Sequence, residues 1–321
     1  MPRCNRARSR ARSGDRVAFN GCGVGGSDMS ERPVWEREGR DWPNRACSRF
    51  VKAAGIRWHV QQAGSGPVLL LVHGTGAATH SWRALLPLLA RDFTVVAPDL
   101  PGHGFTDMPV PSRLSLPGIA AALDALLHTL GVTPELAVGH SAGAAILARM
   151  CLDGSIAPRA LVSLNGAMLP LRGLPGHLFA PIARLVVSIP LTRRMFAWQA
   201  ADRRVVERML RSTGSTIEPA GVEQYVRIAR SPVHAGAALA MMANWDLRPL
   251  EHDLPRLRPH LLLITGSNDR TIPPSDSARV QALVPGSELV SLPGLGHLAH
   301  EEQPARIAAL LHRLAGTSAA A

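Results

Sequence analysis

Several residue types and patterns are scarce in this chain of 321 residues, and two of these scarcities argue against a class of protein. Lysine occurs only at position 52, and aromatic residues make up 4% of the sequence. The four cysteines form no CxxC pair, which argues against a zinc site or a disulfide framework. No uncharged apolar run reaches the roughly 18 residues that a membrane-spanning helix needs. We therefore expect no bound metal, and at most peripheral contact with a membrane.

The charge is strongly positive but unevenly placed. The formal net charge is +11, and six arginines lie within the first 28 residues. No zinc finger, paired RNA-binding aromatics or basic zipper accompanies this charge, so we expect no nucleic-acid partner. Residues 1–48 are expected to be a disordered tail, with Met29 as an alternative start. The first residues lack the apolar centre of a secretory signal, which favours a cytoplasmic location.

From residue 49 onward, apolar strand patterns alternate with helical patterns. Arg49–Lys52 and Ile56–Gln62 suggest a hairpin, and later strands are expected at Val68–Val72, Thr94–Ala97, Leu136–Val138, Ala160–Leu164, Leu261–Thr265 and Glu288–Leu292. Such alternation predicts a mostly parallel sheet covered by helices on both faces. We assign residues 49–167 and 251–321 to this α/β core. Residues 168–250 show helical patterns and no strand pattern, which predicts a helical cap inserted into the core.

The clearest chemical signal is the segment 139–143, GHSAG, which fits the pattern G-x-S-x-G. It lies between a predicted buried strand and an alanine-rich helical stretch, the context that a nucleophile elbow requires. At such a sharp turn, a side chain at either flanking glycine would clash, and the serine hydroxyl is exposed at the carboxyl edge of the sheet. We therefore predict that Ser141 is a catalytic nucleophile.

A serine hydroxyl is a poor nucleophile unless a base, oriented by an acid, removes its proton. Asp269 and His297 each follow one of the last two predicted strands, in the order serine, acid, histidine that accompanies such an elbow. Both should therefore lie at the same sheet edge as Ser141. We predict that His297 is the base and Asp269 the acid, with Asp246 as the next candidate for the acid.

An oxyanion hole needs two converging backbone N–H groups. One should belong to Ala142, the residue after the nucleophile. The other should come from the glycine-rich segment 73–76, HGTG, which follows the strand Val68–Val72. We predict Thr75 as the second donor, with Gly76 as the alternative.

These motifs together resemble the α/β-hydrolase superfamily over residues 49–315. The resemblance rests on His73-Gly74, the segment 99–104 (DLPGHG), the Ser141 elbow, Asp269 and His297. Further segments resemble the magnesium chelatase accessory proteins of bacteriochlorophyll biosynthesis: 41–44 (DWPN), 57–60 (RWHV), 73–76 (HGTG), 142–152, 241–247 (MMANWDL) and 292–302 (LPGLGHLAHEE). The resemblance implies an α/β-hydrolase fold, a phototrophic bacterium, a tetrapyrrole pathway and magnesium chelatase as a partner.

The predicted cap contains thioether and indole side chains that suit a large, flat, apolar ligand. We predict Trp198, Met242 and Trp245 as substrate-binding residues; the alternative is that they only attach the cap to the core. Leu178–Leu191 could instead touch a membrane surface.

Two classes of function fit the sequence. The first is a serine hydrolase without metal or other cofactor, acting on an ester, thioester or activated C–C bond of a bulky apolar substrate such as a tetrapyrrole. The second is a non-catalytic scaffold that delivers magnesium porphyrin or assists the chelatase, since fold alone does not decide function. A cofactor-free haloperoxidase would use the same triad. A hydrolase with an aspartate nucleophile is disfavoured, because Ser141 occupies the elbow.

Overall fold

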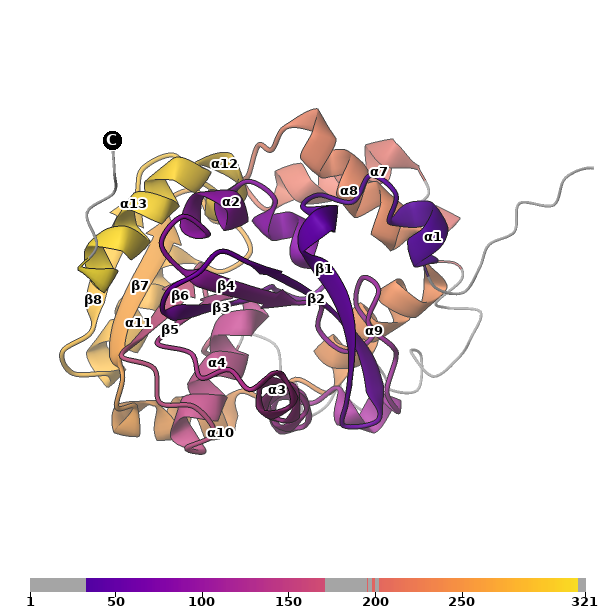
Figure 1. Cartoon of the computed structure of the whole chain (residues 1–321). Helices are drawn as coiled ribbons and strands as arrows, with labels where there is room; N and C mark the ends of the chain where they lie inside the picture. The colour runs from indigo at the N-terminus through magenta and orange to yellow at the C-terminus, as the bar shows by residue number, and fades with distance from the viewer. Residues whose placement is uncertain (1–32, 171–194, 196–197, 200–201, 317–321) are drawn as a thin grey trace, which may run out of the picture.

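The computed structural model describes residues 33–170, 195, 198–199 and 202–316, and these ranges contain an eight-stranded sheet (Figure 1). The strands are β1 (Ser48–Ala53), β2 (Ile56–Ala63), β3 (Val68–Val72), β4 (Thr94–Pro98), β5 (Leu136–His140), β6 (Ala160–Leu164), β7 (His260–Gly266) and β8 (Glu288–Leu292). Every strand that the sequence predicts is present. Most of the expected tail and the stretch 178–191 lie outside the described residues.

The sheet is mostly parallel, as predicted. Its strand order is β1-β2-β4-β3-β5-β6-β7-β8, and only the pairs β1/β2 and β2/β4 are antiparallel. The chain runs from β3 to β4 on one side and returns to β5 on the other. The carboxyl ends of β3 and β5 therefore meet where the strand order reverses, which is where ligands bind in open α/β sheets.

Helices cover both faces of the sheet because its central strands are apolar on both sides. The helices on one face are α3 (Leu116–Leu130), α4 (Ala142–Leu152), α10 (Arg248–Asp253) and α11 (Pro274–Leu283); those on the other are α2 (Leu85–Leu89), α12 (Ala299–Glu302) and α13 (Pro304–Ala315). Within the described ranges, none of the helices is long and apolar enough to cross a membrane.

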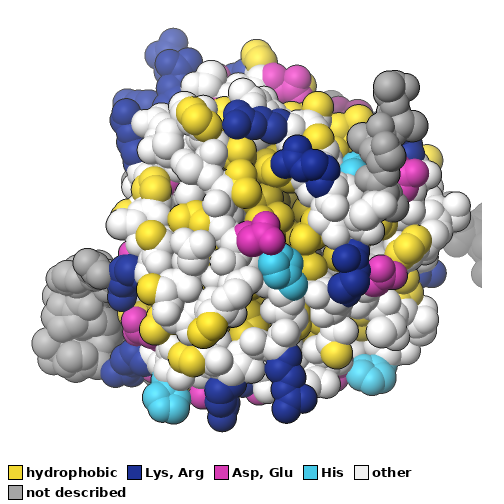
Figure 2. All heavy atoms as spheres, turned by 90° about the vertical axis from the view of Figure 1, so that its left-hand side faces the viewer, with side chains coloured by type: hydrophobic (Ala, Val, Ile, Leu, Met, Phe, Trp, Pro, Cys, Tyr) yellow, Lys and Arg dark blue, Asp and Glu magenta, His cyan; other side chains and the backbone are white. Residues whose placement is uncertain are grey.

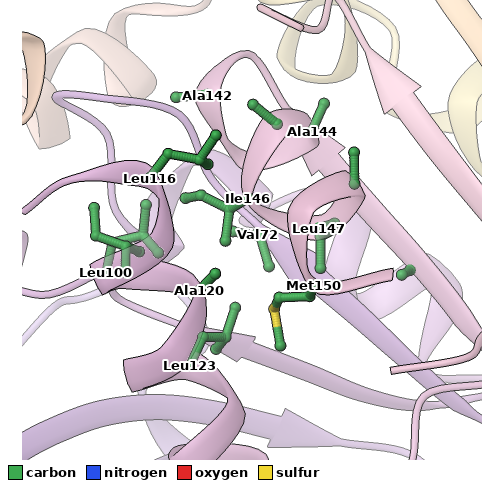
Figure 3. Close-up of a cluster of buried hydrophobic side chains, with 14 of the residues drawn as sticks. Val72, Leu100, Leu116, Ala120, Leu123, Ala142, Ala144, Ile146, Leu147 and Met150 are labelled. Atoms are coloured by element: carbon green, nitrogen blue, oxygen red, sulfur yellow. The ribbon is translucent and has the colours of Figure 1, made fainter. Parts of the chain in front are cut away.

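Helices α3 and α4 form the largest buried cluster together with the sheet (Figure 3). Leu123 of α3 and Ile146 and Met150 of α4 lie close to Val72 of β3, and all four side chains are fully buried. Helix α3 begins at Ser115, whose hydroxyl accepts a hydrogen bond from a backbone N–H of the first turn. This packing fixes the position of α4, and so of the serine at its amino end.

Three further helices, α7 (Arg203–Ser212), α8 (Pro219–Ala229) and α9 (Pro232–Ala243), lie between β6 and β7 in the chain. They are placed at one end of the sheet (Figure 1). Val206 of α7 and Tyr225 of α8 belong to a buried cluster that includes Ala77, after β3, and Leu298, after β8. These helices therefore pack on the loops at the carboxyl edge of the sheet.

Residues 33–48 have defined structure, which corrects this part of the expected tail of residues 1–48. A short helix, α1, spans Trp35–Glu38, and the Trp42 side chain is 2% exposed. Its indole N–H donates a hydrogen bond of 3.0 Å to the hydroxyl of Thr79. Trp42 also packs against Phe105 and Ile228, so its burial holds this segment on the core.

Strand β8 forms one edge of the sheet, and Figure 2 shows this side of the molecule with hydrophobic side chains gathered over its upper part. The Glu288 carboxylate lies 3.4 Å from the imidazole of His260 on β7. Leu289 and Val290 are only half-buried. A charged residue on a short edge strand limits pairing with other chains.

Candidate active site

The Ser141 elbow connects β5 to α4. Ser141 has φ 52° and ψ −119°, a conformation that L-residues rarely adopt. A Cβ atom at Gly139 would lie 2.4 Å from the Ala144 nitrogen, and one at Gly143 would lie 2.1 Å from the Val72 carbonyl oxygen. Both glycines are thus needed for α4 to approach the sheet so closely, as the sequence pattern predicts.

Asp269 follows β7, and its carboxylate is within hydrogen-bond distance of four nitrogen atoms. Its Oδ1 atom accepts hydrogen bonds from the backbone N–H groups of Thr271 (2.8 Å) and Ile272 (2.9 Å). Its Oδ2 atom accepts one from the side-chain amide of Asn165 (2.7 Å) and lies 2.8 Å from Nδ1 of His297. The side chain is buried, so these contacts fix its orientation.

His297 follows β8 and is 6% exposed. Because the Asp269 oxygen can only accept, Nδ1 of His297 carries the hydrogen in this pair. The Nε2 atom then has a free lone pair and can accept a proton. The structure therefore brings the predicted acid and base together in the geometry that a general base requires.

Backbone and imidazole contacts place the Ser141 elbow beside the loop of His297. Nε2 of His140 donates a hydrogen bond of 3.0 Å to the carbonyl oxygen of His297, and their ring centroids are 4.7 Å apart. Burial, and then the neighbouring His300 and His297, holds the pKa of His140 well below its usual value, so this ring is neutral. Among the described contacts, none is a hydrogen bond from the Ser141 hydroxyl to His297. Such a bond often tightens only when substrate binds.

The predicted oxyanion loop, residues 73–76, lies against the elbow. A Cβ atom at Gly74 would lie 2.8 Å from Cβ of Ser141. Within the described residues, the backbone N–H groups of Thr75 and Ala142 have no hydrogen-bond acceptor in the backbone. Both predicted donors are therefore available beside Ser141.

Helix α9 holds this loop from the other side. His234 accepts a hydrogen bond at Nδ1 from the Gly104 N–H (3.1 Å) and donates one from Nε2 to the Gly76 carbonyl oxygen (3.2 Å). Burial lowers the pKa of His234 to about 4, which keeps the ring neutral and able to accept. The Thr75 hydroxyl lies 3.4 Å from the sulfur of Met241, also on α9.

A buried polar network follows His297. Glu301 pairs with the Arg83 guanidinium and accepts hydrogen bonds from the hydroxyls of Ser81 (2.7 Å) and Tyr225 (2.6 Å). Because Ser81 gives its only proton to Glu301, Nε2 of His300 must donate to the Ser81 oxygen, at 2.8 Å. Burial lowers the pKa of His300 to about 3. The network joins α8 to the segment that carries His297.

The predicted substrate-binding residues differ in their surroundings. The side chains of Trp198 and Met242 are 70% and 66% exposed, whereas Trp245 is half-buried and packs against the core cluster beneath α3 and α4. Met241, the neighbour of Met242, is the α9 methionine that contacts the loop of Thr75. A role in substrate binding for the three predicted residues stays a prediction.

Asn165 is the site residue that sequence reasoning missed. It has φ 46° and donates hydrogen bonds to both the Asp269 carboxylate and the Gly296 carbonyl oxygen. Asn165 directly follows β6, just as Asp269 follows β7. The rule that selected Asp269, a polar residue within a few positions after a predicted strand, would have selected Asn165 as well.

In the part of the chain that the structure describes, no group of three or more His, Cys, Asp or Glu side chains is placed to hold a metal ion. Several buried histidines instead contact one another, backbone groups or single carboxylates. His59, for example, lies 2.7 Å from Asp99. That the reaction needs no metal ion stays a prediction.

Comparison with known proteins agrees with this geometry. A profile described as the alpha/beta hydrolase family matches residues 69–310. The chain is 38% identical to the magnesium-chelatase 30 kDa subunit of Rhodobacter capsulatus, over 81% of this chain and 92% of that protein. It is 29% identical to 2-hydroxy-6-oxo-2,4-heptadienoate hydrolase of Pseudomonas putida, over 81% and 93%. An alpha/beta hydrolase fold protein from Burkholderia ambifaria superposes with a TM-score of 0.68 at 24% identity, over 82% of this chain and 98% of that one.

Proposed function

Because this chain belongs to the alpha/beta hydrolase family, we propose that it is a serine hydrolase in which Ser141, His297 and Asp269 form the catalytic triad. The observation that carries the proposal is the buried contact of 2.8 Å between Nδ1 of His297 and Oδ2 of Asp269, beside a serine held at positive φ. A protein that served only as a scaffold would need neither the strained serine nor the fixed tautomer of the histidine.

The proposed reaction is the hydrolysis of an ester or related acyl compound. The Ser141 oxygen attacks the substrate carbonyl carbon while Nε2 of His297 takes the hydroxyl proton. The backbone N–H groups of Thr75 and Ala142 stabilise the negative charge that develops on the carbonyl oxygen. His297 then gives its proton to the leaving group. In the second half of the reaction, His297 takes a proton from water as the water attacks the acyl carbon, and returns that proton to the Ser141 oxygen as the acid product leaves.

Residues 168–250, which include the helices α7, α8 and α9, form the proposed cap over this site. Trp198, Met242 and Trp245 are the proposed contacts for a bulky apolar substrate. The contact between Met241 and Thr75 supports the view that α9 borders the site. We propose a cytoplasmic location on the sequence alone.

The likeness to a magnesium-chelatase subunit favours a role in magnesium insertion into a tetrapyrrole, with the chelatase as partner. Two versions of this role differ in their need for the triad. As an enzyme, the protein would cleave an acyl bond of a tetrapyrrole-related substrate. As a scaffold, it would bind magnesium porphyrin or assist the chelatase without using Ser141.

A complementation experiment separates these versions. We expect that deleting the gene in a host that makes bacteriochlorophyll lowers pigment synthesis, and that wild type restores it whereas Ser141→Ala does not. Restoration by both proteins, at equal protein levels, would favour the scaffold. Normal pigment in the deletion strain would exclude the pathway role and leave the hydrolase proposal standing.

A further inference from the structure

The turn between α7 and α8, residues 213–216, lies between the loop of Asp269 and the loop of His297. The carbonyl oxygen of Thr213 accepts hydrogen bonds from the backbone N–H of Arg270 (3.1 Å) and from that of His297 (3.4 Å). A single carbonyl oxygen of this turn thus connects Arg270, the residue after Asp269, to His297.

Further hydrogen bonds reach from the same turn to each loop. On the acid side, the Asn268 side-chain amide donates to the Gly214 carbonyl oxygen at 2.7 Å. On the base side, the Leu298 N–H donates to the Ser215 hydroxyl oxygen at 2.8 Å, and the Thr216 N–H donates to the Glu302 carboxylate at 3.2 Å. The hydrogen bonds at Ser215 and Leu298 are inside the protein, because both residues are buried.

The contact is close enough to require glycine on two of the three segments. A Cβ atom at Gly214, which has φ 84°, would lie 1.9 Å from the Asn268 carbonyl oxygen. A Cβ atom at Gly296 would lie 2.3 Å from the Gly214 carbonyl carbon. A side chain at either position must move the turn away from the acid loop or the base loop.

The sheet itself does not extend to the catalytic pair. The last paired residues of β7 and β8 are Gly266 and Leu292, several residues before Asp269 and His297. Beyond that point the distance between the two loops depends on contacts such as the Asn268 N–H with the Leu295 carbonyl oxygen (2.8 Å) and those of the turn.

We propose that residues 213–216 form a clamp that positions Asp269 and His297 relative to each other. The inserted helices α7 and α8 are then part of the catalytic framework, in addition to covering it. Gly214 and Ser215 are positioning residues that act through the two loops. This proposal rests on the proposed function for its kinetic consequence, but its structural claim concerns only the acid and the base.

The test compares two glycines with similar positive φ angles, 84° at Gly214 and 79° at Gly286. Gly286 has φ 79°, and nothing lies within 4 Å of a Cβ atom placed there, so Gly286→Ala introduces a similar backbone strain without a clash. For Gly214→Ala we expect kcat for a chromogenic ester to fall about 100-fold, as for a displacement of about 1 Å in a catalytic group. We expect KM within about twofold of wild type, and Gly286→Ala should keep the wild-type kcat.

A second measurement does not depend on activity. In protein labelled with ¹⁵N-histidine, the N–H proton shared between His297 and Asp269 gives an NMR signal that Asp269→Asn should remove. We expect this signal to be lost or to exchange faster with water in Gly214→Ala, and to be unchanged in Gly286→Ala. Should Gly214→Ala fail to fold, Ser215→Ala is the deciding variant, with Ser215→Thr restoring the hydroxyl acceptor and the signal.

The outcomes distinguish the clamp from the proposed function. An inactive wild-type protein whose His297 signal still depends on Gly214 would refute the hydrolase and support the clamp. An active wild-type protein whose clamp variants keep both kcat and the signal would refute the clamp alone. Equal losses in Gly214→Ala and Gly286→Ala would also refute it, because strain without a contact would then explain the effect.

Discussion

Asp269→Asn is expected to lower kcat for ester hydrolysis by about 10⁴-fold while leaving the fold intact. The backbone N–H groups of Thr271 and Ile272 require an oxygen at the Oδ1 position, so the new amide nitrogen must occupy the Oδ2 position. An amide N–H would then face Nδ1 of His297, which can accept it only without its own proton. The imidazole proton would move to Nε2, where it prevents proton removal from Ser141.

The matched control for this variant is Asp246→Asn. Asp246 was the alternative acid on sequence grounds, but its carboxylate is half-exposed and pairs with Arg248 at 2.6 Å. We expect the kcat of Asp246→Asn to stay within about twofold of wild type, as for other surface changes. A large loss in Asp246→Asn together with normal activity in Asp269→Asn would contradict the assignment of the acid.

The protein is expected to unfold in mild acid because it buries neutral histidines near the site. Burial lowers the pKa of His234 to about 4 and that of His300 to about 3, from 6.5. The unfolded chain binds these protons below about pH 6.5 and the folded chain does not, so stability is lost as the pH falls below 6.5. At about 1.4 kcal/mol per pH unit, His234 lowers the stability by about 3 kcal/mol once the pH has fallen to about 4. His300 lowers it by about 5 kcal/mol once the pH has fallen to about 3.

Other groups modify this loss without reversing it. Burial also lowers the pKa values of four further histidines: His73, His80, His103 and His140. The pKa of Glu301 is raised by burial and acts in the opposite sense, but it is a single group. Since domains of this kind are stable by about 5–15 kcal/mol, we expect an unfolding midpoint between about pH 4 and 6.

Circular dichroism during an acid titration measures this midpoint. His300→Gln removes one of the buried titrating groups and should make stability less dependent on pH between 6.5 and 4. His128→Gln, at an exposed histidine of α3, is the control for the substitution itself, because it leaves every buried histidine in place. A wild-type protein that keeps its full stability at pH 4 would contradict the account of the buried histidines.

The order of the elements could be predicted because each strand is a short apolar run bounded by turn residues. The run VLLLV of β3 is fully apolar since helices cover both of its faces, and the elbow glycines are recognisable because backbone atoms occupy the space of their side chains. The rule that polar residues after parallel strands share one edge brought Asp269 and His297 together correctly.

Contacts between segments far apart in the sequence could not be predicted in the same way. Nothing in the local pattern around Gly214 indicates that its neighbours are Asn268 and Gly296. The segment around Trp42 falls within the expected tail, and its burial depends on Phe105 and Ile228, which no local pattern places there. Both misses concern tertiary packing, which periodicity within one element does not report.

The reaction of the purified full chain with a fluorophosphonate probe tests the central claim most directly. Such a probe forms a covalent bond only with a serine whose proton a neighbouring base can remove. The account predicts labelling at the peptide that contains Ser141, labelling lost in Ser141→Ala, and slow labelling in His297→Ala. A folded wild-type protein that remains unlabelled at Ser141, or that is labelled equally fast without His297, would contradict it.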